Sequence, residues 1–247
     1  MKREKLKVEW FTPFAGLEDL SPPVPASEMI PTWIKKMAAH HDRGDVQSGS
    51  YHTLGPKGTH HDAGTFKTCP GWADLYKEAY ILQMWADCII KSSPKGAQAT
   101  FSSASFGSDV HPNFQGLDHA PTDDYTITLK LIAPWHLRTP PGWGVLQLPL
   151  QWEFNPNFDV AMGVIHSDIV HEINPQLMLR NPEFTLKFGT PIAMYLPIKL
   201  DKSLEKSSSI GYITPEQQHS FARGSLGAFL KFTQSYRMII ERLNRYV

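Results

Sequence analysis

One stretch, Leu129 to Leu200, decides the fold: LKLIAPWHLRTPPGWGVLQLPLQWEFNPNFDVAMGVIHSDIVHEINPQLMLRNPEFTLKFGTPIAMYLPIKL. Short apolar runs alternate in it with clusters of proline, glycine and asparagine. Proline cannot donate to a strand ladder and glycine tolerates positive φ, so these clusters mark turns between strands. In and just before the stretch, the apolar runs predict strands at Tyr125–Ile132, Val145–Leu150, Ala161–Ile165, Leu177–Leu179, Phe184–Phe188 and Ile192–Ile198.

The chain before this stretch begins with an arm. Leu6–Phe11 is predicted to be a strand, and Ser21-Pro22-Pro23-Val24-Pro25 holds the backbone in polyproline-like geometry without internal hydrogen bonds. Such an arm must lie against its own domain or against a neighbouring molecule. Pro31 then opens a predicted helix over Thr32–His40, because the missing N–H of proline costs nothing in a first turn. A second helix is predicted to start at Cys69-Pro70-Gly71-Trp72.

The segments between these helices and the central stretch are less regular. His41–Gly64 is polar, contains glycine and lacks periodicity, which predicts a long surface loop. Strands are predicted at Tyr80–Ile90 and Ala99–Phe106. Gly107–Asp124, which carries His111 and His119, is predicted to be a loop.

The C-terminus changes character at Thr214. Thr214-Pro215-Glu216-Gln217 has the form of a capping box with proline at the first helical position. Apolar residues spaced alternately by three and four then follow, at Leu226, Phe229, Thr233, Tyr236, Ile240, Leu243 and Val247. This pattern favours one amphipathic helix packed on the β domain, and a coiled coil around a symmetry axis is the alternative.

Together these patterns predict a mainly β fold. Several short strands at regular spacing are typical of a sandwich, jelly roll or barrel. We expect a single jelly-roll or β-clip-like domain over residues 31–213, with short peripheral helices. An extended arm over 1–30 and an amphipathic helix over 214–247 complete the expected organisation.

Charge and composition exclude some partners. The 247 residues contain 24 Lys plus Arg and 24 Asp plus Glu, so we expect no direct nucleic-acid partner and no membrane surface. No apolar run reaches the ~20 residues that span a bilayer, and the first residues lack the apolar core of a secretory signal. Two cysteines favour a reducing compartment. Only 19% of residues are charged, below the ~25% typical of globular domains, which suggests covered surface.

The densest polar cluster is Ile165-His166-Ser167-Asp168-Ile169-Val170-His171-Glu172. On a strand, His166 and Asp168 would project to the same face. With a second histidine such as His219 they would form the facial triad of an iron(II)/2-oxoglutarate oxygenase. However, His219 follows the Thr214 cap in a predicted helix, and H-x-D pairs are common. Surface or hydrogen-bonded histidines are therefore the favoured interpretation, and no metal or cofactor is expected.

Two other histidine clusters, His40-His41-Asp42 and His60-His61-Asp62, have no spaced second pair of the kind that structural zinc sites use. We interpret them as solvated loop residues. The sequence contains no glycine-rich phosphate loop and no G-x-S-x-G elbow.

Part of the chain resembles the jelly roll of the dUTPase and dCTP deaminase superfamily. The resemblance lies in Gly163-Val164-Ile165-His166-Ser167-Asp168 and in the segment from Phe184 to Ala193. It implies a jelly-roll architecture and a trimer. The catalytic aspartate of that family falls on His166, and the glutamine that follows Ile-Ala falls on Met194. The family's phosphate-binding serine motif is not visible, so the resemblance implies architecture more than chemistry.

A broader resemblance covers residues 30–200. Ile30-Pro31-Thr32-Trp33, Phe66-Lys67-Thr68-Cys69-Pro70-Gly71, Pro134–Trp143 and Gly189-Thr190-Pro191-Ile192 resemble, in the same order, an uncharacterised protein family of tailed phages and some bacteria. Its proline-rich blocks look like framework that sets turns. Within them, Arg138 could anchor Asp168 or bind an anionic ligand. The resemblance implies a phage gene product, located in the virion or the host cytoplasm.

These observations favour a non-enzymatic structural or assembly protein of a tailed-phage particle. It would act as a homo-oligomer, with a trimer as one option, and would contact other particle proteins. A first alternative is a trimeric nucleotide-binding or nucleotide-hydrolysing protein, with Arg138, His166 and Asp168 at a subunit junction. The iron oxygenase is the second alternative. If a ligand site exists, Arg138, His166, Asp168 and His171 are its candidates, and His166 and Asp168 are the catalytic ones.

Overall fold

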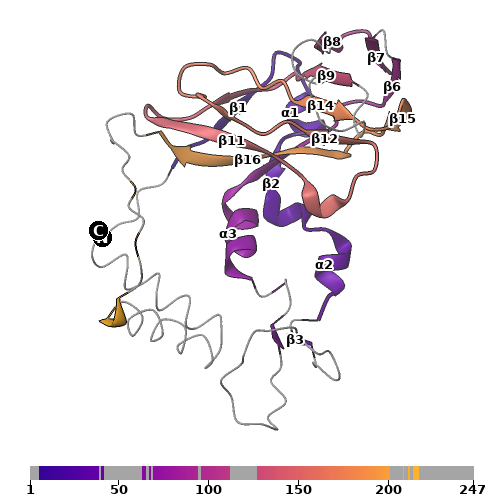
Figure 1. The fold of residues 1–247 in the computed structure, drawn as a ribbon. Coiled ribbons are helices and arrows are strands. Elements are labelled where there is room, and N and C mark those ends of the chain that lie inside the picture. The colour runs from indigo at the N-terminus through magenta and orange to yellow at the C-terminus, as the bar shows by residue number, and fades with distance from the viewer. Residues whose placement is uncertain are drawn as a thin grey trace. The chain divides into compact units, whose positions relative to one another are not determined.

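A computed structural model describes residues 6–38, 40–41, 63–64, 67, 69–93, 96–111 and 127–200, with isolated positions at 208, 211 and 214–216 (Figure 1). The chain divides into two compact units. Unit 1 comprises Met1–Pro31 and Tyr76–Ser203, and unit 2 comprises Thr32–Leu75 and Leu204–Val247.

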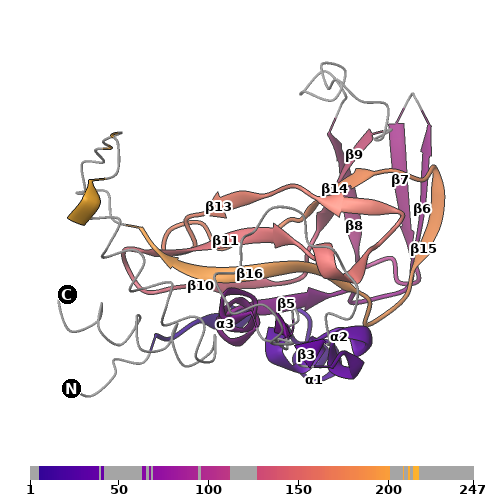
Figure 2. The same cartoon turned by 60° about the horizontal axis from the view of Figure 1, so that its bottom comes forward.

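The largest sheet of unit 1 has five antiparallel strands in the order β13-β11-β16-β5-β2. Figure 2 shows β13, β11 and β16 running side by side, with β13 at the outer edge. The strand bounds are β2 Val24–Pro25, β5 Tyr80–Gln83, β11 Trp143–Pro149, β13 Gly163–Ile165 and β16 Pro191–Lys199.

Three smaller antiparallel sheets complete unit 1. The first has the order β12-β14-β9-β8, the second β15-β6-β7, and the third pairs β1 with β10. Figure 2 shows β6, β7 and β15 together at one end of the unit. Their bounds are β1 Glu9–Phe11, β6 Cys88–Ser93, β7 Gly96–Phe101, β8 Gly107–His111, β9 Ile127–Ile132, β10 His136–Arg138, β12 Phe158–Val160, β14 Gln176–Leu179 and β15 Glu183–Leu186.

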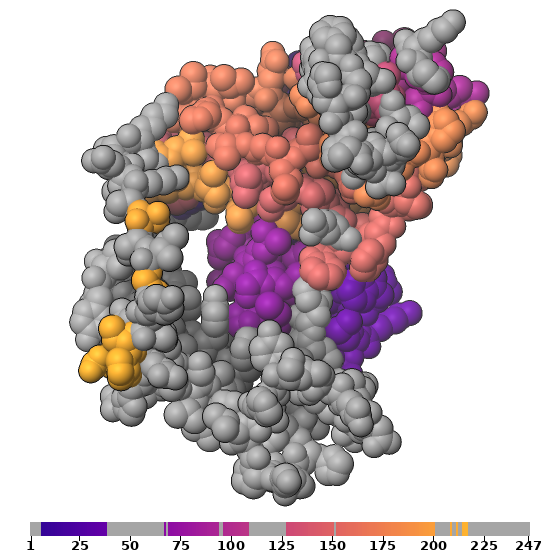
Figure 3. Space-filling model, viewed as in Figure 1, coloured from indigo at the N-terminus to yellow at the C-terminus, as the bar shows by residue number. Residues whose placement is uncertain are grey.

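One hydrophobic core joins these sheets. Buried side chains alternate with partly buried or exposed ones along β9, β14 and β15, as expected for strands with one face inward. Val145 and Tyr195 of the five-stranded sheet, Leu129 and Leu177 of the four-stranded sheet, and Ile90 of the three-stranded sheet belong to the same buried cluster. Figure 3 shows one face of this unit, on which residues 127–200, coloured salmon to orange, make up much of the coloured surface. The predicted mainly β, sandwich-like fold class is thus confirmed.

Most predicted strands are confirmed with small shifts, but one is wrong. Tyr80–Ile90 forms two strands, β5 and β6, that lie in different sheets. The chain leaves the first sheet at Met84, whose N–H donates to the Thr190 carbonyl oxygen at 2.7 Å and whose carbonyl accepts from Gly189 at 2.8 Å. The connecting residues Trp85 and Ala86 are buried, so the apolar pattern runs on without marking the break.

Other strands lie where none was predicted. β8 occupies the first part of the predicted loop Gly107–Asp124, because β9 offers it a partner along its whole length. β10 and β12 have only three residues each, too few for a period-2 pattern to show.

The N-terminal arm crosses its own unit. β1 pairs with β10, where Trp10 lies opposite Leu137, and β2 pairs with β5, where Val24 lies opposite Ile81. Between them lies the short helix α1 (Leu17–Leu20), and the 3-10 turn Ala26–Met29 follows β2. In the described residues, the arm therefore lies against its own chain.

In unit 2, helix α2 covers Thr32–Lys36 and is shorter than the predicted Thr32–His40. The Lys67 ammonium donates to the carbonyl oxygens of Lys35 and Met37 at 3.0 and 3.2 Å, which caps the end of the helix. Helix α3 covers Pro70–Glu78 and begins at the predicted proline. It starts in unit 2 and ends in unit 1. β3 (His40–His41) pairs with β4 (Ala63–Gly64) at the two ends of the predicted long loop.

Several predictions fall outside the described residues. They concern Asp42, the His60-His61-Asp62 cluster, His119, His219 and the apolar stripe from Leu226 to Val247. The predicted division at residues 30 and 213 also stays a prediction. In the part of the chain that the structure describes, no helix is long and apolar enough to cross a membrane.

Candidate functional site

The first candidate region surrounds the turn between β10 and β11. The N–H of Trp143 donates to the Pro140 carbonyl oxygen at 3.0 Å, and Gly142 has φ 77°. Pro141 and Gly142 thus occupy the two central positions of a type II turn, for which proline and glycine are the preferred residues. The prediction that this proline and glycine cluster marks a turn between strands is confirmed.

His166 and Asp168 do not lie on a strand. The prediction that they project to the same strand face, as a facial triad would need, is therefore wrong. β13 ends at Ile165, and the N–H groups of Ile169 and Val170 both donate to the His166 carbonyl oxygen, at 2.9 and 2.8 Å. These bonds close a turn immediately after the strand. The Asp168 carboxylate accepts a hydrogen bond from the Gly142 N–H at 3.1 Å, and the His166 side chain is exposed.

A buried pair of hydroxyl groups joins this turn to the type II turn. Thr139 Oγ1 lies 2.8 Å from Ser167 Oγ and donates to the Trp143 carbonyl oxygen at 2.8 Å. The Thr139 N–H also donates to the Ser167 carbonyl oxygen at 3.2 Å. Because both side chains are buried, leaving either hydroxyl unpaired would cost free energy. The hydroxyl groups of Thr139 and Ser167 therefore hold the two turns together.

Arg138 does not contact Asp168. Its Nε and Nη2 atoms donate to Glu9 Oε2 at 3.1 and 2.9 Å, and its guanidinium lies 5.0 Å from the centre of the Phe11 ring. Hydrogen bonds from Lys7 and then from Arg138 lower the pKa of Glu9. Arg138 thus fastens the N-terminal arm to β10.

The side chain of His171, the last residue of the predicted set, is hydrogen-bonded to backbone carbonyl oxygens. Its Nδ1 atom lies 3.2 Å from the Leu137 carbonyl oxygen and 3.1 Å from that of Ser167, so the ring nitrogen can donate to either. The structure places His171 and Asp168 in one turn region and gives each a role in holding the backbone. Among the described residues, no three His, Cys, Asp or Glu side chains are grouped to hold a metal ion.

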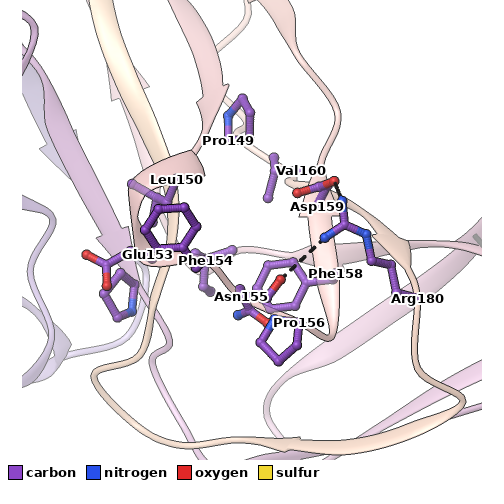
Figure 4. Close-up of a pocket in the computed structure, with 12 residues that line it drawn as sticks. Pro149, Leu150, Glu153, Phe154, Asn155, Pro156, Phe158, Asp159, Val160 and Arg180 are labelled. Atoms are coloured by element: carbon purple, nitrogen blue, oxygen red, sulfur yellow. Dashed lines mark hydrogen bonds and ion pairs between the residues drawn. The ribbon is translucent and has the colours of Figure 1, made fainter. Parts of the chain in front are cut away.

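The second candidate region is a pocket of about 400 Å³ that the sequence patterns did not predict (Figure 4). It lies between the end of β11, the 3-10 turn Gln151–Glu153, β12, the residue after β14 and the start of β16. Its lining is apolar apart from four polar residues, which are Glu153, Asn155, Asp159 and Arg180.

Phe154 at this pocket has an unusual backbone. Its φ is 51°, a left-handed conformation that is uncommon for a residue with a side chain, and its ring is 67% exposed. Such strained residues cluster at ligand sites. The sequence pattern of this region could not reveal the pocket, because Gln151–Asn157 resembles an ordinary proline-containing turn.

The polar residues of the pocket have contrasting partners. Arg180 forms an ion pair with Asp159. Glu153 is half-buried, and this burial raises the pKa of its carboxyl group above the usual 4.5. The Glu153 carboxylate also acts on Tyr76. The pKa of Tyr76 is raised to about 12, first by burial and then by this negative charge.

The third candidate region is the outer edge of the five-stranded sheet. Within the described residues, β13 has only β11 as a strand neighbour. Four large apolar side chains in and beside this strand are strongly exposed, and we call them the β13 edge. They are Met162 (69% exposed), Val164 (50%), Ile169 (67%) and Val170 (53%).

Comparisons with known proteins give little further guidance. No family model matches the chain, and no curated protein matches it. One similar solved structure is a point mutant of the dUTPase of Staphylococcus bacteriophage 80alpha with dUpNHpp. The two share 6% identity at a TM-score of 0.32, over 56% of this chain and 80% of that one. A likeness this low carries no functional argument. The resemblance to a tailed-phage family stays a prediction.

Proposed function

We propose that the protein is a non-enzymatic assembly protein that works as a homo-oligomer joined through the β13 edge. The observation that supports this proposal is an open strand edge surrounded by exposed apolar side chains. Unpaired backbone groups on an edge strand form a template for another strand. Four exposed apolar residues beside it add surface that gains free energy on burial.

The β13 edge is short, with three residues in the strand, but it lacks the charged residues and the proline that protect many edge strands. Lysine, proline and inward-pointing charges are the usual means of preventing edge-to-edge pairing. The segment from Val160 to Ser167 contains none of Lys, Arg, Asp, Glu or Pro. An edge strand of this kind is suited to pairing with a strand of another chain.

A second copy of the chain is the partner that fits best. Across a two-fold axis, a strand pairs with its own copy in antiparallel fashion, so one patch serves both subunits. The segment from Val160 to Ser167 brings no acidic or basic side chain to this contact except His166, and the formal net charge of zero does not oppose self-association. Two-fold pairing gives a dimer, whereas the dUTPase-like resemblance implies a trimer.

The setting we propose is a tailed-phage particle, and the family resemblance over residues 30–200 is its support. We expect peptides of this protein in mass spectra of purified particles from its source. If purified particles lack the protein although the lysate contains it, the phage-particle setting is contradicted. The proposal of a homo-oligomer would not be affected.

Sedimentation equilibrium of the full chain tests the oligomer. We expect a mass above the 27.9 kDa of one chain. Val164→Lys places a charge in the proposed contact and should return the mass to that of one chain. Ile132→Lys is the matched control, since Ile132 is also an exposed aliphatic residue but lies on β9, which has partners on both sides. A monomeric wild-type chain, or equal dissociation of both variants, would refute the proposed contact.

The nucleotide-binding alternative gains no specific support. It needs Arg138 and Asp168 to be directed at a ligand, but these side chains bind Glu9 and the Gly142 N–H. The iron alternative depends on His219, which lies outside the described residues.

A further inference from the structure

The pocket beside Phe154 has the size and lining of a ligand site. Its volume of about 400 Å³ lies in the range of ~300–1,000 Å³ that is common for small-molecule sites. Phe158, Val160 and Ile192 are buried and belong to the part of its wall formed by β12 and β16. Phe158 stacks on Phe184 with 6.0 Å between the ring centres, so this wall is fixed by packing.

The exposed part of the pocket includes an aromatic ring, that of Phe154. The ring of Phe154 forms an edge-to-face pair with Trp152 at 6.4 Å. Figure 4 shows the rings of Phe154 and Phe158 between Glu153 on one side and the Arg180–Asp159 pair on the other. A ligand in this space would therefore meet two aromatic rings and charged groups at both ends.

The charges of the pocket favour a cation. Arg180 and Asp159 neutralise each other in an ion pair. No basic side chain of the described residues forms an ion pair with Glu153, which is therefore the uncompensated charge of the lining. Burial raises the pKa of its carboxyl group, which means that the ionised form lacks stabilising contacts. A cation placed beside it would supply them.

We propose that this pocket binds an organic cation, an ammonium group on an apolar body. The ammonium would pair with the Glu153 carboxylate, and the faces of aromatic rings such as Phe154 attract cations. The apolar body would lie against Phe158, Val160 and Ile192. An anionic ligand fits less well, because Asp159 already occupies the guanidinium of Arg180. The ammonium could come from a free amine or from a lysine side chain of a peptide.

Isothermal titration calorimetry on the full chain tests this site at neutral pH in an amine-free buffer. The probe is 2-phenylethylammonium, and 2-phenylethanol is its neutral counterpart. We expect the ammonium to bind and the alcohol to bind at least ~10-fold more weakly, since hydrogen bonds to charged groups are among the strong ones. Glu153→Gln should weaken binding of the ammonium by a similar factor.

Glu18→Gln is the matched control, because Glu18 is an exposed glutamate on α1 and does not line the pocket. It should leave the affinity unchanged. Equal affinity for the ammonium and the alcohol, unchanged affinity in Glu153→Gln, or no binding of the ammonium at ~10 mM would each overturn the proposal.

A second titration with Nα-acetyl-lysine amide distinguishes the two sources of the ammonium. Binding that is lost in Glu153→Gln would assign the pocket to lysine side chains of a partner. Binding of 2-phenylethylammonium alone would assign it to free amines. The pocket shares no residue with the β13 edge, so the result does not depend on the proposed oligomer.

Discussion

The two edges of the five-stranded sheet differ in chemistry. At one edge, β2 (Val24–Pro25) is flanked by Pro22 and Pro23, so the edge has few N–H groups to offer to a further strand. At the other edge, β13 (Gly163–Ile165) has no proline and no charge, and exposed apolar side chains surround it. The five-stranded sheet is therefore closed at the arm and open at β13.

This difference gives the N-terminal arm a physical role. β2 covers the edge of β5, and the Ala26 N–H adds a hydrogen bond to the Ala79 carbonyl oxygen at 2.9 Å. Without the arm, β5 would present its own unpaired backbone. The arm therefore directs any edge pairing to β13.

The largest effect is expected from a change behind β13. A Cβ atom at Gly144 would lie 2.6 Å from the Ile165 carbonyl oxygen, so Gly144→Ala must push β13 away from β11. Overpacking of this kind costs about 1–3 kcal/mol in the free energy of unfolding. Urea denaturation measures it. Gly163→Ala is the control on β13 itself, because a Cβ there meets nothing within 4 Å, and an equal loss in both variants would contradict the close approach.

The next effect concerns the turns beside the β13 edge. Ser167→Ala removes the buried hydrogen bond to Thr139 and should lower the free energy of unfolding by about 0.5–1.5 kcal/mol. His166→Ala changes an exposed neighbour and should stay within about 0.5 kcal/mol of the wild type. Urea denaturation of both variants measures these two free energies of unfolding. A larger loss for His166→Ala would show that this exposed side chain has a structural role that its position does not indicate.

A smaller effect is expected at the closed edge. Pro25 has φ −53°, which alanine can also adopt, so Pro25→Ala acts mainly by making the unfolded chain more flexible. It should lower the free energy of unfolding by about 0.4–1 kcal/mol. We expect the sedimentation mass to stay that of the wild type, because β2 is not the contact. A change in mass would show that both edges take part in assembly.

The smallest effect is a pH dependence confined to the arm. Hydrogen bonds from Lys7 and Arg138 lower the pKa of Glu9 below 4.5, so its contribution to stability is complete above that pH. The contribution is lost as pH falls through the lowered pKa. Urea midpoints of the wild type and Glu9→Gln should therefore differ at neutral pH and converge in acid. A constant gap across pH would contradict the ion pair with Arg138, and neither result should alter self-association through β13.

Much of this fold follows from local sequence. The turn at Pro141 and Gly142, the start of α3 at Pro70 and most strands of the five-stranded sheet could be predicted, because proline, glycine and apolar periodicity act on neighbouring residues. The break between β5 and β6 could not, since Trp85 and Ala86 are apolar and buried although they lie in no strand. Backbone partners at Thr190 and Gly189, far along the chain, set that break.

By itself, the sequence determined that the protein is mainly β and where most of its turns lie. The tertiary structure decided what the polar residues do. Arg138 binds Glu9 instead of Asp168, and Asp168 holds the Gly142 N–H. It also decided that β13 is an outer strand and that Glu153 lines a pocket. Residue type and spacing fix local backbone geometry, whereas the partner of a side chain and the edge of a sheet depend on contacts between segments distant in sequence.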